Sequence, residues 1–296
     1  MARTARREFL RIAGSALASA ALPKQAGASE AWSSGIERPA FRLPEGAIDC
    51  HMHIYDDRFP AAAGTKLRPP NATVTQYRLL QERLGVKRNV VVTPSTYGTD
   101  NRCTLDALRA FGGNARGVAV VDSSVSDGEL QTLDRGGIRA VRFNLSYPGA
   151  TTLDMLAPLA GRIANLGWHI ELVVQGARLP ELERHLAGLP CPLVVDHIAH
   201  VPQPGGLSSD AFRAAQRLID KGNTWITLSG PYVDSKMGAP AYDDVAPVPK
   251  ALIDLAPERM LWGTAGRIQR RRASSRTMRA CWTSSPAGSD VRTGSN

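Results

Sequence analysis

The sequence is poor in cysteine, with four in 296 residues, and these lie far apart at Cys50, Cys103, Cys191 and Cys281. This spacing matches neither a zinc-binding cysteine pair nor a disulfide framework. After the N-terminus there is no apolar run long enough to span a membrane. No GxGxxG motif follows the first predicted strand, which argues against a dinucleotide-binding sheet. These absences leave a globular fold, and 43% of the residues are hydrophobic.

Positive charge is abundant but lies at the two ends of the chain. The formal net charge of +9 would ordinarily suggest a nucleic-acid or membrane partner. Residues 1–29 carry five basic side chains and one acidic one, and residues 266–296 carry seven and one. The ends account for +4 and +6, so residues 30–265 carry a net charge of −1. The body is nearly neutral, and we expect no nucleic-acid partner.

The N-terminus has the pattern of an export signal. Arg6 and Arg7 precede a modestly apolar stretch over residues 12–22, and small residues follow it. Paired arginines followed by Phe-Leu are typical of twin-arginine signals, which export folded proteins. We therefore expect residues 1–29 to be a signal peptide for the twin-arginine export machinery, cleaved near 26–28. The protein would be periplasmic or exported, without a stable membrane anchor; the alternative is an ordinary basic helix.

From residue 47 onward, short apolar or β-branched runs alternate with longer segments of helical pattern. This alternation predicts repeated βα units and a parallel sheet. The predicted strands are 47–53, 88–95, 117–122, 139–145, 169–175, 192–198, 224–229 and 259–264. Eight such strands fit a (β/α)8 TIM barrel, a fold of about 250 residues whose chemistry gathers at the C-terminal ends of the strands. We expect an irregular lead-in over 30–46 and the barrel over 47–264.

Histidines stand at the ends of two predicted strands. His51 and His53 are two residues apart at the end of the first strand, so both point to the same side. Two such imidazoles can hold a metal ion or polarise a carbonyl oxygen. His197 follows Asp196 at the end of the sixth strand and is a third ligand or a substrate hydrogen-bond donor, while His200 is expected to be peripheral. The alternative for the first two is a pair of satisfied core histidines.

The other candidates are substrate-binding side chains. Arg142 on the fourth strand presents planar donors that match a carboxylate, unless it serves a structural ion pair. Ser95 and Tyr97 after the second strand are candidate hydroxyl donors, and Gln175 after the fifth is a candidate amide donor.

Taken as a set, these segments resemble the amidohydrolase superfamily. The matching segments are Asp49–Asp56 (DCHMHIYD), Gly137–Phe143 (GIRAVRF), Asp196-His197 and Arg259–Thr264 (RMLWGT). The likeness covers roughly residues 45–264. It is closest to the amidohydrolase-2 branch, which includes 2-pyrone-4,6-dicarboxylate lactonase and D-galactarolactone isomerase. This resemblance implies a site built from His51, His53, His197 and a carboxylate on strand eight.

The resemblance also implies an activity. In this branch the histidines polarise a lactone carbonyl, arginines such as Arg142 hold carboxylates, and the strand-eight Asp moves protons, without an obligatory metal. Gln175 and Glu171 stand where a binuclear centre would need a histidine or a modified lysine. A carboxylated lactone is therefore the expected substrate, of a lactonase or a lactone isomerase, and a single zinc or manganese on His51 and His53 remains an option. The alternatives are a metal-dependent decarboxylase of an aromatic or related acid, and a non-catalytic remnant or binding protein.

The family pattern breaks at strand eight. The family continues Gly-Thr-Asp-Trp-Pro-His, whereas this chain continues from Gly263-Thr264 with Ala265-Gly-Arg-Ile-Gln. Deleting one base from an Asp codon, in GAC TGG CCG CAT CCA G, yields GCT GGC CGC ATC CAG, which encodes this new sequence. We therefore predict a frameshift, with a natural divergent tail as the alternative. Residues 265–296 would form an aberrant, disordered tail in place of the last helix, and activity and solubility would suffer.

Overall fold

A computed structural model describes residues 39, 42–239 and 241–265, and it contains the predicted TIM barrel. Its eight strands form one parallel sheet in sequence order. They are β1 (Ile48–Met52), β2 (Arg88–Val92), β3 (Ala115–Ala119), β4 (Ile138–Asn144), β5 (His169–Val173), β6 (Leu193–Val195), β7 (Thr224–Leu228) and β8 (Met260–Trp262). All eight predicted strands are confirmed, most of them shorter than expected. The predicted signal peptide and the tail beyond 265 lie outside the described residues.

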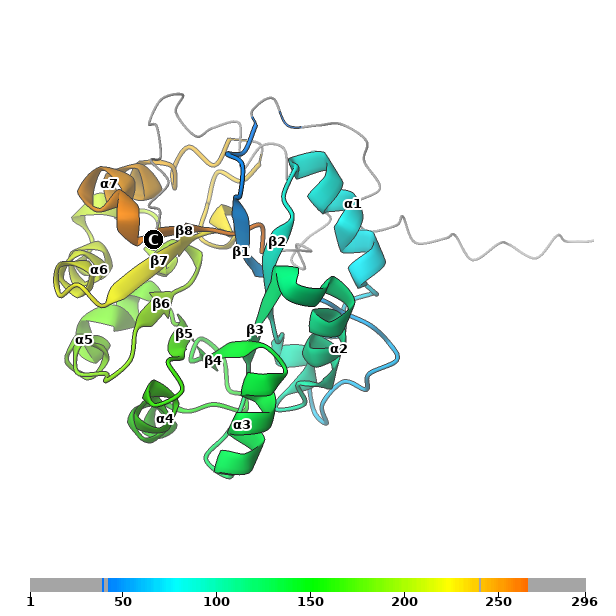
Figure 1. The fold of residues 1–296 in the computed structure, drawn as a ribbon. Coiled ribbons are helices and arrows are strands. Elements are labelled where there is room, and N and C mark those ends of the chain that lie inside the picture. The colour runs from blue at the N-terminus through cyan, green and yellow to red at the C-terminus, as the bar shows by residue number, and fades with distance from the viewer. Residues whose placement is uncertain (1–38, 40–41, 240, 266–296) are drawn as a thin grey trace, which may run out of the picture. The chain divides into compact units, whose positions relative to one another are not determined.

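Helices surround the strands in alternation with them (Figure 1). They are α1 (Val74–Leu84), α2 (Arg102–Phe111), α3 (Asp127–Arg135), α4 (Leu156–Ala164), α5 (Leu179–Ala187), α6 (Asp210–Asp220) and α7 (Pro247–Leu255). The predicted loss of the last barrel helix concerns residues beyond 265, outside the described part of the chain. None of the described helices is long and apolar enough to cross a membrane.

Local sequence explains why these helices form where they do. Thr73 starts α1 and Ser126 starts α3, each as part of a capping box in which side chain and backbone bond reciprocally. In α6 the buried side chains recur at helical spacing, as at Phe212, Ala215 and Ile219, so one stripe faces the sheet. β4 is covered on both faces and reads as a nearly continuous buried run.

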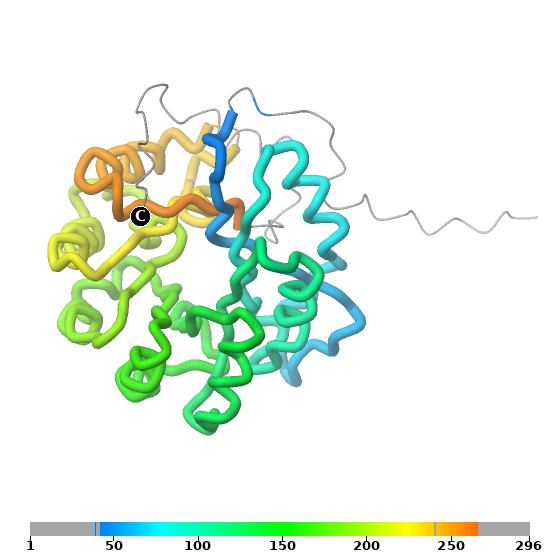
Figure 2. The backbone as a smooth tube through the Cα atoms, viewed as in Figure 1, coloured from blue at the N-terminus to red at the C-terminus, as the bar shows by residue number. Residues whose placement is uncertain are grey.

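The ring of strands closes where the end of β8 meets β1. The backbone N–H of Ala265 donates to the carbonyl of His51 over 2.8 Å. The backbone and the hydroxyl of Thr264 donate to the two carboxylate oxygens of Asp49 over 2.9 and 2.6 Å. A Cβ on Gly263 would lie 2.7 Å from Cβ of His51, so only glycine allows this approach. Figure 2 shows the orange β8 beside the blue β1. This closure sets the position of His51.

Candidate active site

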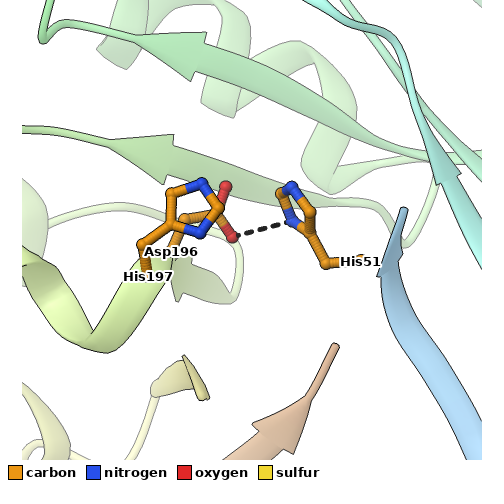
Figure 3. A group of neighbouring side chains, drawn as sticks. All are labelled: His51, Asp196 and His197. Atoms are coloured by element: carbon orange, nitrogen blue, oxygen red, sulfur yellow. Dashed lines mark ion pairs between the residues drawn. The ribbon is translucent and has the colours of Figure 1, made fainter. Parts of the chain in front are cut away.

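His51 forms the floor of the site. Its side chain is completely buried, and its Nδ1 lies 3.2 Å from Oδ1 of Asp196, which follows β6 (Figure 3). The same atom lies 3.5 Å from Oε1 of Glu171 in β5. Both ring nitrogens of His51 and both carboxylate oxygens of Asp196 are buried without a hydrogen-bond partner in the described part of the chain. The floor therefore holds polar atoms that are close together but not satisfied.

The three predicted histidines come together in space. The ring centroid of His51 lies 5.0 Å from that of His53 and 5.0 Å from that of His197. His51 is deeper in the barrel, so of these three histidines only His53 and His197 line the cavity above it. Burial lowers the pKa of His53 well below its usual range, and the neighbouring His51 acts in the same direction. Burial likewise lowers the pKa of His197, so both rings are neutral at pH 7.

The protonated ring nitrogen of His53 is fixed by its hydrogen bond. Nδ1 lies 2.8 Å from the carbonyl oxygen of Val92, the last residue of β2. A carbonyl oxygen can only accept, so Nδ1 carries the proton, and in a neutral ring Nε2 then presents a lone pair. His53 thus offers the cavity a hydrogen-bond acceptor or a metal ligand, and no donor.

His197 is delivered by an unusual left-handed turn. The four residues His197–His200 have φ angles of 56°, 56°, 53° and 46°, although none is glycine. Left-handed backbone costs about 1–2 kcal/mol per residue, so tertiary packing must hold this turn. Gly176 packs directly against this turn, and only glycine allows that packing, because a Cβ there would come within 2.1 Å of the His200 carbonyl oxygen. Ser229, after β7, fixes the ring of His197 through a 2.9 Å hydrogen bond at Nδ1.

Arg142 is a buried guanidinium with spare donors. It comes from β4, and Nη1 lies 3.8 Å from Oε1 of Glu171, too far for a hydrogen bond. Its Nε and Nη1 have no hydrogen-bond partner among the described residues. Burial raises the pKa of Glu171 well above its usual range, and the Asp196 carboxylate adds to the effect. Arg142 and Glu171 therefore lie within ion-pair range without a hydrogen bond, and the guanidinium keeps donors that no described residue accepts from.

The cavity above this floor has a volume of about 460 Å³, within the range of small-molecule sites. Its polar and charged lining side chains are His53, Tyr55, Ser95, Arg142, Asn144, Ser146, Tyr147, Gln175, His197, His200, Gln203, Tyr232, Asp234 and Lys236. Ser95 and Gln175 are therefore where the sequence predicted them to be. Ala265, at the end of β8, also lines the cavity, with φ of 56° and 3% of its surface exposed.

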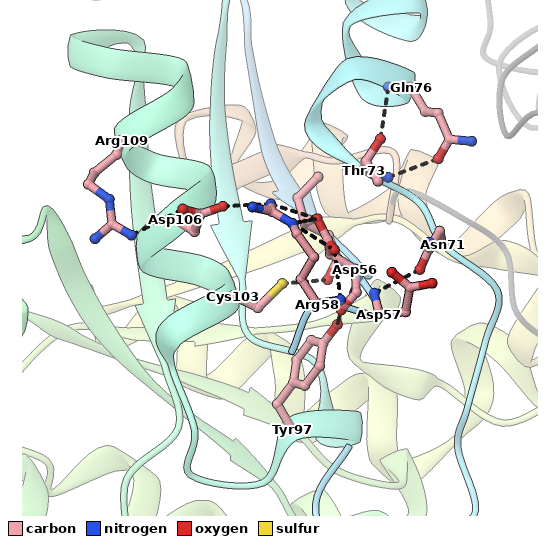
Figure 4. A network of polar contacts seen from close by, with 11 residues as sticks. Asp56, Asp57, Arg58, Asn71, Thr73, Gln76, Tyr97, Cys103, Asp106 and Arg109 are labelled. Atoms are coloured by element: carbon pink, nitrogen blue, oxygen red, sulfur yellow. Dashed lines mark hydrogen bonds and ion pairs between the residues drawn. The ribbon is translucent and has the colours of Figure 1, made fainter. Parts of the chain in front are cut away.

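Tyr97 does not line the cavity, and this corrects its predicted place beside the substrate. Its hydroxyl accepts from the backbone N–H of Asp56 over 2.9 Å and donates to the Asp56 carbonyl over 3.2 Å (Figure 4). The Asp56 carboxylate in turn pairs with Arg58 over 2.8 Å. The short helical turn after β2 buries Tyr97 against the loop that follows β1. Its role is to hold that loop.

Three groups at the cavity wall were not expected from the sequence. His200, predicted to be peripheral, lines the cavity, and its Nδ1 lies 3.0 Å from Oδ2 of Asp234. Asp234 follows β7 and carries no motif that would reveal it. Asn144 could have been found, because it is two residues beyond Arg142 on β4 and so points to the same side.

Three residues of the floor fit a metal ion. Ligand atoms of His51, Asp196 and His197 all lie within 4.8 Å of one another, and all three residues are buried. The unsatisfied nitrogen and oxygen atoms described above are of the types that zinc and manganese bind. Of the predicted ligands, this group contains His51 and His197, and Asp196 stands in it where His53 was expected.

Comparison with known proteins places the chain in a family. The Amidohydrolase family (Amidohydro_2) matches residues 48–270, which contain all eight strands. The chain belongs to the amidohydrolase family. The family expected from its motifs is thereby confirmed.

Individual relatives agree with this placement. The amidohydrolase is 38% identical over 245 residues to 2-pyrone-4,6-dicarboxylate hydrolase of Comamonas testosteroni, covering 79% of this chain and 80% of that protein. It is 30% identical to D-galactarolactone isomerase of Agrobacterium fabrum, covering 78% and 79%. Among solved structures, an Agrobacterium tumefaciens protein is 26% identical with a TM-score of 0.77, covering 85% and 91%.

Proposed function

We propose that this amidohydrolase acts on a carboxylated lactone, as a lactonase or a lactone isomerase. The observation that carries the proposal is that Arg142 and two neutral histidines line the same cavity. Arg142 lines the cavity, and a guanidinium suits a carboxylate; His53 and His197 line the same cavity, where the lactone ring would sit. The two relatives described above are named for a lactone hydrolase and a lactone isomerase.

Each group has a task in this reaction. Arg142 fixes the substrate carboxylate and so orients the ring. His197, held by Ser229, polarises the lactone carbonyl or moves a proton to it, and the ring of His51 lies directly beneath it. Ser95 and Gln175 supply hydrogen bonds to the rest of the substrate.

A divalent metal is an addition that the site could accept. Zinc or manganese held by His51, Asp196 and His197 would supply a Lewis acid for the carbonyl. The same three residues favour a second candidate function, a metal-dependent decarboxylase. Metal analysis of the purified protein tests the second candidate, because a metal-dependent decarboxylase needs stoichiometric zinc or manganese, whereas the lactonase could also work without it.

We further propose that turnover by this chain is impaired. The relevant position is Ala265, where the family pattern has the strand-eight Asp. Its left-handed φ of 56° suits Asp, Asn or Gly better than Ala, which supports a recent replacement. Resequencing the codons around this residue tests the frameshift directly.

Export by the twin-arginine pathway is also a proposal, supported by the Arg6-Arg7 signal pattern. Cell fractionation and N-terminal sequencing of the mature protein test it.

Lactone opening by the purified protein tests the central proposal. The substrates are 2-pyrone-4,6-dicarboxylate and D-galactarolactone, and ring opening is followed by absorbance and by acid release. We expect slow opening of at least one lactone, and loss of that activity in His197→Asn and in Arg142→Met. Isomerisation to another lactone is followed by NMR, and neither opening nor isomerisation by this chain or by Ala265→Asp, with either lactone, would overturn the proposal.

A further inference from the structure

The cavity also indicates which kind of carboxylated lactone it binds. We propose that the ligand is a lactone with a single carboxylate and at least one free hydroxyl group, as in the lactones of sugar acids. This inference rests on the proposed function, and two features of the lining carry it.

The first feature is the scarcity of buried positive charge. Among the described residues that line the cavity, Arg142 is the only arginine or lysine that is buried. Lys236 is exposed at the rim, and Asp234 adds negative charge beside His200. A second carboxylate at the floor would lose its hydration without gaining a cation, which is costly. The lining therefore matches one carboxylate and not two.

The second feature is the lone pair on Nε2 of His53. Nδ1 donates to the carbonyl of Val92, so Nε2 of the neutral ring can only accept, and His53 lines the cavity. A flat lactone with only carbonyls and carboxylates has no donor to offer it. A substrate hydroxyl donates to this atom and accepts from a neighbour at the same time.

Neutral polar groups elsewhere in the lining suit further hydroxyls. Asn144 donates through Nδ2 to the Ser95 hydroxyl over 3.2 Å, so the Ser95 proton is left to bond a ligand. Gln175 adds both a donor and an acceptor at the wall. These groups bind hydroxyls without the charge that a second carboxylate would need.

Calorimetric titration of the full chain, with EDTA in the buffer, tests the proposal without requiring turnover. The three probes are D-glucaro-1,4-lactone with one carboxylate and hydroxyls, D-gulono-1,4-lactone with hydroxyls alone, and 2-pyrone-4,6-dicarboxylate with two carboxylates and no hydroxyl. We expect the first probe to bind at least about 10-fold more tightly than either of the others, because each lacks one of the two interactions.

Point variants show which side chains of the cavity contribute to binding. Arg142→Met should weaken binding of the first probe about 10- to 100-fold, as expected for a charged hydrogen-bonded pair. Lys236→Met is the matched control, since it removes the same charge from the rim, and it should change binding by less than about 3-fold. His53→Asn keeps a donor for Val92 but removes the Nε2 acceptor, and should weaken only the hydroxylated probes, about 3- to 10-fold.

Because Arg142→Met leaves Glu171 without its neighbour, the double variant with Glu171→Gln is measured beside it, and circular dichroism confirms folding. Tighter binding of the dicarboxylate than of D-glucaro-1,4-lactone would overturn this inference while leaving the proposed function intact. An unchanged affinity of the first probe in His53→Asn would overturn it too. Failure of all three lactones to bind would remove the proposed function as well.

Discussion

Replacing Ala265 by aspartate should restore much of the activity that we expect this chain to lack. Ala265 follows β8, lines the cavity and is tied to His51 through a 2.8 Å backbone hydrogen bond. A carboxylate on this Cβ would face the substrate from the wall next to the histidines. General acid–base catalysis contributes about 10²–10⁴-fold in rate, which corresponds to about 3–5 kcal/mol of barrier. We expect kcat/KM of Ala265→Asp to rise by a factor in this range.

The backbone at this position also bears on the result. Ala265 has a φ of 56°, a conformation that Asp and Asn adopt more readily than Ala. Neither substitution should therefore strain the chain, and both should leave the thermal unfolding midpoint unchanged or slightly higher. Ala265→Asn is accordingly the matched control. Asn has the same shape and backbone preference as Asp, but its amide cannot act as a general base at neutral pH.

Lactone opening is measured for the starting chain and both variants at equal folded concentration, judged by circular dichroism. The reasoning requires Asp to accelerate opening and Asn to leave it near the starting rate. Equal acceleration by Asn would show that backbone relief, and not proton transfer, limits this chain. An Asp variant that is folded yet no faster would refute the assignment of position 265 to the catalytic machinery.

Three further predictions concern stability. Gly176→Ala should destabilise the fold by about 3 kcal/mol or more, since the added Cβ would meet backbone atoms of the left-handed turn. The control is Gly161→Ala in α4, which has open space around it and should be neutral or stabilising in urea unfolding. Equal effects of the two substitutions would contradict the packing argument. Thr264→Val should cost about 1–3 kcal/mol, because it removes a 2.6 Å hydrogen bond from buried Asp49, and Thr264→Ser should retain most of that stability. Burial lowers the pKa of His169 to about 4, so its ring is neutral in the folded chain, whereas in the unfolded chain it binds a proton below its ordinary pKa of 6.5. Stability should therefore fall by up to about 3 kcal/mol between pH 6.5 and 4, and His169→Gln should flatten this dependence in chemical unfolding curves; an unaltered slope would exclude the histidine as its source.

The strands and the histidine cluster could be predicted because simple periodicities govern them. Buried parallel strands read as apolar runs, which is why β4 to β6 stand out in the sequence. The alternation of side chains along a strand predicted that His51 and His53 share one side. Barrel geometry then predicted that strand ends far apart in sequence meet, and the 5.0 Å separation of the His51 and His197 rings confirms it.

The positions of side chains on loops could not be predicted in the same way. Tyr97 was expected at the substrate, but a turn after β2 directs its hydroxyl to the backbone of Asp56. The left-handed turn at His197–His200 has no glycine to signal it, since the cause lies in the packing of Gly176 from another loop. Asp234, on the loop after β7, meets His200 at the cavity wall over 3.0 Å, and no sequence motif marks it.

Barrel closure and catalysis depend on the same few residues, so a change at the end of β8 affects both. Asp49 holds Thr264 through two hydrogen bonds, and the next residue, Ala265, bonds the backbone of His51. Burial raises the pKa of Asp49, which makes these donors necessary for its charged form. Because Gly263 and Thr264 make these closure contacts, His51 is held in place whichever side chain stands at position 265. A substitution of Thr264, one residue earlier, would remove the hydrogen bonds that position the floor of the site.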